Sequence, residues 1–188
     1  AYATLSVIDR ALRSITEDIQ EAIDGSLWIK TPAGYCIYHP QTETFERDMH
    51  QVFVGMGINV MPQLSYIDRY HNLWCYVPKR GIMCYNMQQQ MNYEFGFTGS
   101  ANGSHGVPQG DICSIGECKD GALIVYSDGL IVCCDIMHQQ SVVWTSNEIA
   151  QSKLRNTNTL KVFSDQMDNI WLYGQGTLFV LNKKTRTW

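Results

Sequence analysis

Histidines carry the side chains best suited to chemistry near neutral pH, because an imidazole can ligate a metal ion or act as a general base. None of the five lies at metal-ligand spacing from another histidine, a cysteine or a carboxylate on one predicted element. His39 ends an apolar run, where we expect a turn residue. The pattern predicts no metal site, no catalytic base and no cofactor. The five are His39, His50, His71, His105 and His138.

Recurring aspartates are the second group that could do chemistry. Asp24, Asp120 and Asp168 each stand shortly before an apolar run. Carboxylate pairs can hydrolyse glycosidic bonds, but an aspartate that recurs in a tight turn is expected to hydrogen-bond its own backbone. We therefore assign no catalytic residue. The acids that do not recur, and that could border a ligand site, are Glu17, Asp18 and Asp111.

The sequence motif that contains these aspartates occurs four times. Its anchor residues are Trp28, Trp74, Ile124 and Trp171, at separations of 46, 50 and 47 residues. A glycine follows every anchor and opens a second apolar run; these are Gly34, Gly81, Gly129 and Gly176. Two short runs joined by a glycine-containing turn predict a β-hairpin, because glycine readily adopts the positive φ of such turns.

A further apolar run precedes each anchor and another follows each hairpin, so every unit contains four predicted strands. A period of about 40–50 residues built from short apolar runs is typical of a β-propeller blade. We predict an all-β fold: a β-propeller fragment of about four blades, each of four antiparallel strands. The blade units lie at approximately 12–47, 63–95, 111–144 and 159–188, within a single partial propeller spanning 1–188. We expect the chain to be cut from a longer propeller and to expose apolar faces that favour self-association.

The first 24 residues allow two interpretations. Ile8, Leu12, Ile15, Ile19 and Ile23 fall at helical spacing, which indicates an amphipathic helix. The phase of the repeat instead places a strand at residues 12–17, followed by a long turn to Gly25. We favour the strand, because the repeat extends over the whole chain.

Unrepeated segments are where we expect a ligand. The recurring tryptophans Trp28, Trp74 and Trp171 could stack on a sugar, but a residue that recurs with the fold is expected to pack between blades. The irregular loops at 50–62 and 97–110, which include Asn102 and His105, are therefore favoured as the functional surface. No individual ligand-binding residue is assigned.

Seven cysteines are compatible with two redox states. Cys36, Cys84, Cys133 and Cys134 lie inside apolar runs, and Cys133 and Cys134 should face opposite sides of one strand. No pair has zinc-site spacing, Cys113 and Cys118 included. If Lys79 and Arg80 form a two-residue turn, Cys75 lies opposite Cys84, either as a disulfide or as two buried thiols.

Composition narrows the choice of partners. The net charge is −4 without a basic stripe, which argues against nucleic acid. No run of about 18 apolar residues predicts a membrane-spanning helix. Residues 1–5 lack the features of a signal peptide, as they would in a mature or trimmed chain.

The repeat resembles the two-component regulator propeller repeat, which runs roughly D-x-x-G-x-L-W-I-G-T-x-x-G-L-x-x-Y-D. The resemblance covers about residues 10–188. The first and second units keep most of the pattern, whereas the third departs from it, with Ile124 for the tryptophan and Cys133 for the tyrosine. The matching residues are Asp24, Gly25, Leu27, Trp28, Ile29, Thr31, Gly34, Tyr38 and Phe45, then Asn72, Leu73, Trp74, Gly81, Tyr85 and Asn86, then Asn169, Ile170, Trp171, Leu172, Gly176, Asn182 and Trp188.

This resemblance implies a periplasmic ligand-sensing segment of a hybrid two-component sensor histidine kinase. Such propellers often detect oligosaccharides, and the parent protein signals across the inner membrane as a homodimer. This segment would itself be non-catalytic, because it has no phospho-accepting histidine box, ATP lid or receiver aspartate pocket. It would neither enter the membrane nor contact nucleic acid. The alternatives are a propeller glycosidase or polysaccharide lyase, and a non-catalytic protein-interaction scaffold.

Overall fold

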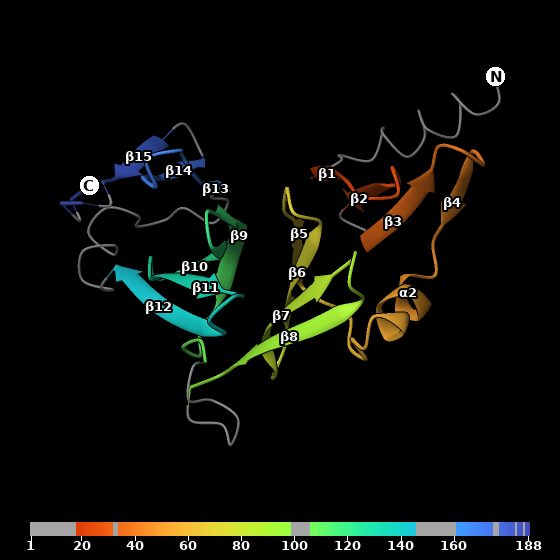
Figure 1. Ribbon diagram of the computed structural model, residues 1–188, viewed down its shortest axis with the longest axis horizontal. Coiled ribbons are helices and arrows are strands. Elements are labelled where there is room, and N and C mark those ends of the chain that lie inside the picture. The colour runs from red at the N-terminus through yellow and green to blue at the C-terminus, as the bar shows by residue number, and fades with distance from the viewer. Residues whose placement is uncertain are drawn as a thin grey trace.

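The structure is a computed structural model of the chain. It describes residues 18–31, 34–98, 106–145, 161–174, 177–182, 184–185 and 187–188. Strands dominate these segments, with one helix, α2 (Met49–Gly55), among them (Figure 1). Within the same segments no helix is long and apolar enough to cross a bilayer.

The strands follow the predicted repeat. The first unit comprises β1 (Asp18–Glu21), β2 (Leu27–Thr31), β3 (Gly34–His39) and β4 (Thr44–Glu46). The second comprises β5 (Leu64–Ile67), β6 (Asn72–Val77), β7 (Gly81–Asn86) and β8 (Met91–Gly96). The third comprises β9 (Ile112–Cys118), β10 (Gly121–Tyr126), β11 (Ile131–Asp135) and β12 (Gln140–Thr145). The fourth comprises β13 (Lys161–Ser164), β14 (Ile170–Gly174) and β15 (Thr177–Leu181), with an isolated bridge between Asn182 and Thr187.

Each unit is an antiparallel sheet in sequence order, which confirms the predicted propeller-like fragment. A parallel bridge between Phe163 and Glu117 joins β13 to β9, so the third and fourth units share one seven-stranded sheet. The first strand of each unit lies toward the middle of an arc, and β4, β8 and β12 lie on its outside (Figure 1).

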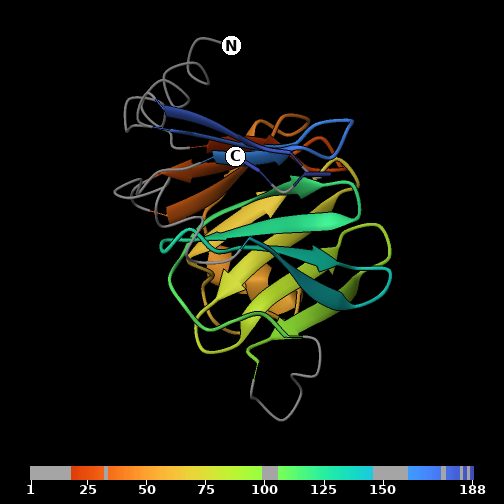
Figure 2. The ribbon, with the colours of Figure 1, turned by 90° about the vertical axis from the view of Figure 1, so that its left-hand side faces the viewer.

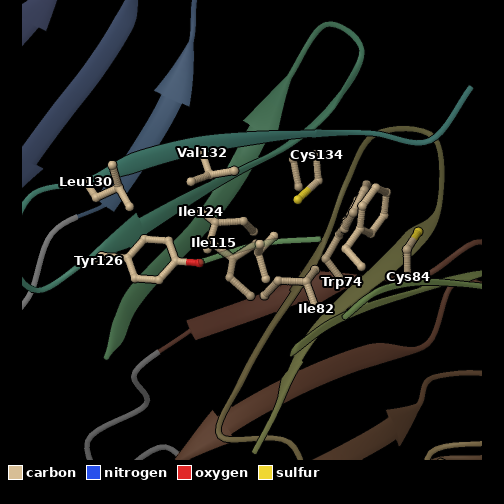
Figure 3. Packing of buried hydrophobic residues seen from close by; sticks show 12 residues of the cluster. Trp74, Ile82, Cys84, Ile115, Ile124, Tyr126, Leu130, Val132 and Cys134 are labelled. Carbon is tan, nitrogen blue, oxygen red and sulfur yellow. The ribbon is translucent and has the colours of Figure 1, made fainter. Parts of the chain in front are cut away.

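Apolar side chains fill the space between neighbouring units, because each strand buries alternate residues against one neighbour or the other. Figure 3 shows Trp74 and Ile82 of the second unit packed with Ile124 and Val132 of the third. These two twisted sheets face each other in Figure 2. A second cluster joins the first and second units through Trp28, and a third joins the third and fourth. Neighbouring blades thus stabilise each other.

Half of the loop predicted at 50–62 folds inward as α2. Asp48 caps this helix by accepting a hydrogen bond from the Gln51 backbone N–H. Met49, Phe53 and Ile58 are buried between the first and second units. Their apolar area explains the difference from the prediction, because a segment with three such side chains gains more by burial than by remaining exposed. Exposed apolar atoms on this loop belong mainly to its end, near residues 60–61.

The innermost strand of the first unit is β1, where the sequence predicted a long turn. Asp18 pairs with Lys30 and Glu21 with Leu27, so the turn spans only residues 22–26. The strand predicted at 12–17 and the alternative helix lie outside the described residues, apart from Ile19 and Ile23.

The turn between β6 and β7 determines how Cys75 and Cys84 lie relative to each other. Val77 pairs with Gly81, which leaves a three-residue turn with Lys79 at φ 67°. The register therefore places Cys84 opposite Trp74 rather than Cys75. Since neighbours along a strand face opposite sides, Cys75 and Cys84 lie in different apolar clusters. The conditional placement of one opposite the other was therefore wrong, and the alternative of two buried thiols holds. Cys133 and Cys134 do face opposite sides, as predicted.

Candidate functional site

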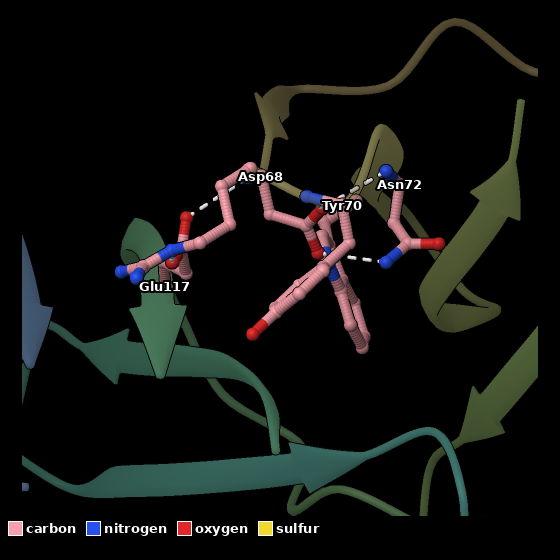
Figure 4. Close-up of polar contacts among 6 residues, drawn as sticks. Asp68, Tyr70, Asn72 and Glu117 are labelled. Atoms are coloured by element: carbon pink, nitrogen blue, oxygen red, sulfur yellow. Dashed lines mark hydrogen bonds and ion pairs between the residues drawn. The ribbon is translucent and has the colours of Figure 1, made fainter. Parts of the chain in front are cut away.

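A buried carboxylate fixes the turn between the first two strands of the second unit. Asp68 accepts hydrogen bonds from the backbone N–H groups of Tyr70 and Asn72, from Asn72 Nδ2 and from Trp74 Nε1, each at 2.9 Å (Figure 4). Its side chain is enclosed at the end of β5. The carboxylate thereby satisfies the turn backbone and the anchor indole together.

The fourth unit repeats this cap atom for atom. Asp165 accepts hydrogen bonds from the Met167 and Asn169 backbone N–H groups, from Asn169 Nδ2 and from Trp171 Nε1 at 2.9–3.0 Å. The shared signature is an aspartate six residues before the anchor tryptophan and four before an asparagine. Sequence reasoning missed both caps, although this recurrence could have revealed them. A residue present in two units serves the shared fold.

The Asp165 cap predicts a dependence on pH. Hydrogen bonds from Trp171 and Asn169 hold the pKa of Asp165 at about 2, below its usual 3.8. A carboxylate with a lowered folded-state pKa stabilises the fold above its unfolded value, and that contribution is lost as pH falls through the folded value. We expect the Trp171 indole N–H resonance to shift between pH 4 and pH 2. The Asp165→Asn variant lacks this carboxyl, so the same shift in that variant would contradict the assignment.

The third unit uses the equivalent position differently. Strand pairing sets Tyr66, Ile115 and Phe163 opposite the anchors of their own units. Counting two residues onward from each gives Asp68, Glu117 and Asp165. In the third unit Ala122 and Ile124 offer no side-chain donors, and the turn between β9 and β10 has two residues, 119–120, where the second unit has four, 68–71. Glu117 is therefore left without the partners that its counterparts have in their own blades.

Arg69 of the second unit supplies those partners instead. Its backbone N–H donates to Glu117 Oε2 at 3.0 Å, and its Nε donates to Glu117 Oε1 in a close ion pair (Figure 4). Glu117 is only 8% exposed, whereas the Arg69 side chain is 66% exposed. The guanidinium is thus anchored at Nε while much of the side chain faces solvent. This inter-blade pair is unrepeated, and no sequence signal marked it.

Two tyrosines accompany this pair. Tyr70, next to Arg69 in the same turn, is 55% exposed although its backbone is held by Asp68. Tyr66 is half-buried, and burial raises its pKa to about 12, with Glu117 and Asp68 adding to the shift. The Tyr66 phenol therefore stays protonated at neutral pH. Arg69, Tyr70 and Glu117, which we call the inner rim, combine a cation, an exposed ring and a carboxylate on a rigid turn.

The inner rim belongs to one end of the arc of first strands. Gln20 of β1 accepts a hydrogen bond from the Ile67 backbone N–H at the end of β5. Arg69, just past β5, reaches Glu117 near the end of β9, and Glu117 pairs with Phe163 of β13. The turns that follow the four first strands therefore gather on one side. Their exposed residues differ from unit to unit, which is what a specific ligand requires.

The recurring tryptophans and aspartates singled out in the sequence serve packing and turn structure. Trp28 and Trp74 are buried between units, as expected, whereas Trp171 is only partly buried and stacks on Phe163 at 6.1 Å. Asp24 binds its own turn through the Ser26 backbone N–H at 2.9 Å, and Asp168 lies in a turn at φ 61°. Asp120 occupies the two-residue turn between β9 and β10.

Of the three acids proposed for a ligand border, the two in the described residues have separate partners. Asp18 forms an ion pair with Lys161 at 3.4 Å, which links the first and fourth units. Asp111 lies just before β9, where its carbonyl accepts from the Ser127 backbone N–H. Glu17 lies outside the described residues, as do Asn102 and His105. In the second favoured loop, Val107 is buried and bridges Phe97.

The described histidines are separate from one another. His39 ends β3, His50 lies in α2, and His71 occupies the capped turn at φ 60°. His138 is exposed and contacts Asp135 through Nδ1 at 2.6 Å, which raises the His138 pKa. Within the described segments no three His, Cys, Asp or Glu side chains form a group that could hold a metal ion.

Solved structures with the same architecture include bacterial extracellular proteins. Two are extracellular domains of BT4673 from B. thetaiotaomicron, described as a one-component and as a hybrid two-component system. They match at TM-scores of 0.59 and 0.53, with 15% and 13% identity over 90% and 89% of this chain. PorZ, a surface component of the Porphyromonas gingivalis type-IX secretion system, matches at a TM-score of 0.54, with 14% identity over 92% of this chain. This likeness establishes the fold.

The chain spans only 20–26% of the length of these three proteins. No protein-family model matches it, and no curated protein sequence does. The specific repeat family expected from the sequence is therefore a hypothesis, whereas the propeller-like architecture is established.

Proposed function

We propose that this chain is a periplasmic ligand-sensing segment of a hybrid two-component sensor histidine kinase and that it binds oligosaccharides. The observation that carries the proposal is the inner rim: Glu117 stands where Asp68 and Asp165 cap a turn, but it pairs instead with Arg69 of the neighbouring unit, beside the exposed Tyr70. The described extracellular context of the BT4673 domains supports this proposal.

The inner rim has the chemistry that a sugar requires. An arginine held at Nε keeps its remaining N–H donors in a fixed fork, which suits the paired oxygens of a sugar or a uronate. An exposed tyrosine ring offers an apolar face with a hydroxyl at its edge. Because the turn is fixed by Asp68 and by the inter-blade pair, little side-chain entropy would be lost on binding.

Signalling would follow from the position of the inner rim between two blades. A ligand that contacts Arg69 and reaches the third unit would favour one arrangement of the second and third blades over another. In the proposed homodimeric parent protein, that preference would alter propeller packing and pass through the membrane to the kinase. The segment itself would leave its ligand chemically unchanged.

The binding test uses isothermal titration calorimetry with a panel of neutral and uronate-containing oligosaccharides. We expect Tyr70→Ala to weaken binding about 3- to 10-fold by removing the stacking face, and Arg69→Ala to weaken it about 10-fold or more. Tyr70→Ala keeps the backbone N–H that Asp68 binds, so it leaves the cap intact.

Arg80→Ala is the matched control. Arg80, in the turn before β7, also pairs with a glutamate at 2.8 Å, but its partner is Glu94 on the outer strand β8 of the second unit. Its removal should leave affinity unchanged. Equal losses in Arg69→Ala and Arg80→Ala, or no binding by the wild-type chain to any sugar in the panel, would contradict the inner rim as the site.

Two alternatives are separated by simple measurements. Chromatography of the sugars after incubation would detect hydrolysis or elimination, which a glycosidase or lyase would cause and a sensor would not. The likeness to PorZ favours a non-kinase surface scaffold as the second candidate. The coding sequence beside this segment distinguishes the sensor from the surface scaffold, because a sensor requires a membrane helix and a kinase downstream.

A further inference from the structure

Two cysteines of the third unit lie in direct contact. Cys118 Sγ, at the end of β9, is 3.0 Å from Cys133 Sγ of β11. Strand β10 lies between them: Cys118 pairs with Gly121, and Cys133 pairs with Leu123, two residues further along β10. Both cysteines belong to the apolar cluster between the third and fourth units.

We propose that Cys118 and Cys133 are a disulfide-forming pair that fastens β9 to β11 across β10. A sulfur–sulfur bond is about 2.05 Å long, so the two atoms need to approach by about 1 Å. Because β10 separates β9 from β11, and the Cα atoms of a disulfide lie within about 7 Å of each other, closing the bond requires the end of β9 to move toward β11 as well as side-chain rotation. The pairing does not depend on the proposed sensor role; only the compartment that would supply the oxidant does.

The surroundings of the pair determine which cysteine attacks the oxidant first. The Cys133 thiol and the backbone N–H groups of Asp120 and Gly121 hydrogen-bond the Cys118 sulfur, which lowers the Cys118 pKa. The pKa of Cys133 is raised by this hydrogen bond and by burial. Cys118 is therefore the better nucleophile. It is also adjacent to the exposed turn at residues 119–120, through which a thiol oxidant can approach.

The reaction is a thiol–disulfide exchange with a disulfide oxidant, either glutathione disulfide or a protein oxidant of the compartment. The Cys118 thiolate attacks the oxidant, forms a mixed disulfide and releases one oxidant thiol. Cys133 then loses its proton and attacks the Cys118 sulfur, which expels the second oxidant thiol. The two protein thiols lose two electrons and two protons, and the oxidant disulfide gains them.

The other cysteines are poorly placed for the same chemistry. Cys75, Cys84 and Cys134 are completely buried, and burial raises the pKa of each. Burial also raises the pKa of Cys113 to about 11 and that of Cys36 above its usual value. An oxidising compartment would therefore leave five separated thiols and one bridge. One bridge is what an oxidising compartment would select from such a set.

The test compares the reduced chain with the same chain equilibrated in a glutathione redox buffer, denatured and alkylated with iodoacetamide. Reduced protein should carry seven labels, one per cysteine, and oxidised protein five, which is seven minus two. Peptide mapping without reductant should join the peptides that contain Cys118 and Cys133. The bridge closes a short loop, so the oxidised form should melt about 5 °C higher or more.

Cys134→Ser is the matched control, because Cys134 neighbours Cys133 but faces the opposite side. It should keep the bridge and carry four labels after oxidation, one fewer than the oxidised wild type. Cys133→Ser should show no intramolecular bridge and at most a glutathione adduct at Cys118. Seven labels on oxidised wild-type protein, a bridge between other cysteines, or a lower melting temperature on oxidation would overturn the proposal. Because mapping is done on the wild-type chain, the result does not require the variants to fold.

Discussion

Replacing Asp68 with alanine is expected to destabilise the second blade strongly and to weaken its contacts with the blades on either side. The carboxylate accepts four hydrogen bonds inside a protein interior, where it is only 3% exposed. Without it, Trp74 Nε1 and the Asn72 donors are left buried and unpaired. Each unsatisfied group costs about 1–3 kcal/mol, so we expect a loss of about 3–5 kcal/mol in the free energy of unfolding.

Urea denaturation followed by tryptophan fluorescence measures this loss. A domain has only about 5–15 kcal/mol of stability, so Asp68→Ala is expected to fold marginally. Asp165→Ala is the matched control, since Asp165 accepts the same four hydrogen bonds at the more exposed fourth unit. Its loss should be clearly smaller. Equal losses at the two positions would show that burial does not set the energy of the cap, contrary to our interpretation.

The repeat allowed the fold to be predicted because structural residues recur wherever the structure recurs. Trp28 and Trp74 are buried between units, and the hairpin glycines Gly34, Gly81 and Gly129 adopt positive φ. The first strand was harder to place. β1 carries Gln20 where the other units have Tyr66 or Phe163 opposite the anchor, and it begins and ends with acids. A strand with so little apolar signal is found only through its pairing.

The inner rim could not be predicted, because its defining contact joins two units. Arg69 and Glu117 are 48 residues apart in the chain, and neither residue belongs to a motif. The different use of Glu117 accompanies a turn of two residues, 119–120, where the second unit has four, 68–71, and element boundaries are the least certain part of a sequence-based prediction. The same uncertainty misplaced Cys75 opposite Cys84. Helix α2, by contrast, was within reach, since Met49 and Phe53 stand four residues apart behind the capping Asp48.

Adding one methyl group at Gly116 is expected to separate the third and fourth blades. A Cβ on this residue of β9 would lie inside contact distance of the Val162 carbonyl oxygen and 2.6 Å from Val162 Cγ1. The carbonyl is backbone, so β13 itself must move away, and the pairing of Phe163 with Glu117 would be lost. Overpacking of this kind costs about 1–3 kcal/mol, and more where backbone must shift; we expect about 3 kcal/mol or more for Gly116→Ala.

Hydrogen–deuterium exchange shows which strands lose protection in Gly116→Ala and by how much. Amides of β13 and β14 should exchange faster in Gly116→Ala, while those of β6 and β7 keep their protection, because the cluster between the second and third units does not include Gly116. Gly55→Ala is the control, since a Cβ at this helical glycine has nothing within 4 Å and should stabilise α2 by about 0.5–1 kcal/mol. If Gly116→Ala exchanged like the wild-type chain at β13, the close approach of β9 to β13 would be wrong. The shared sheet of the third and fourth units would then be wrong as well.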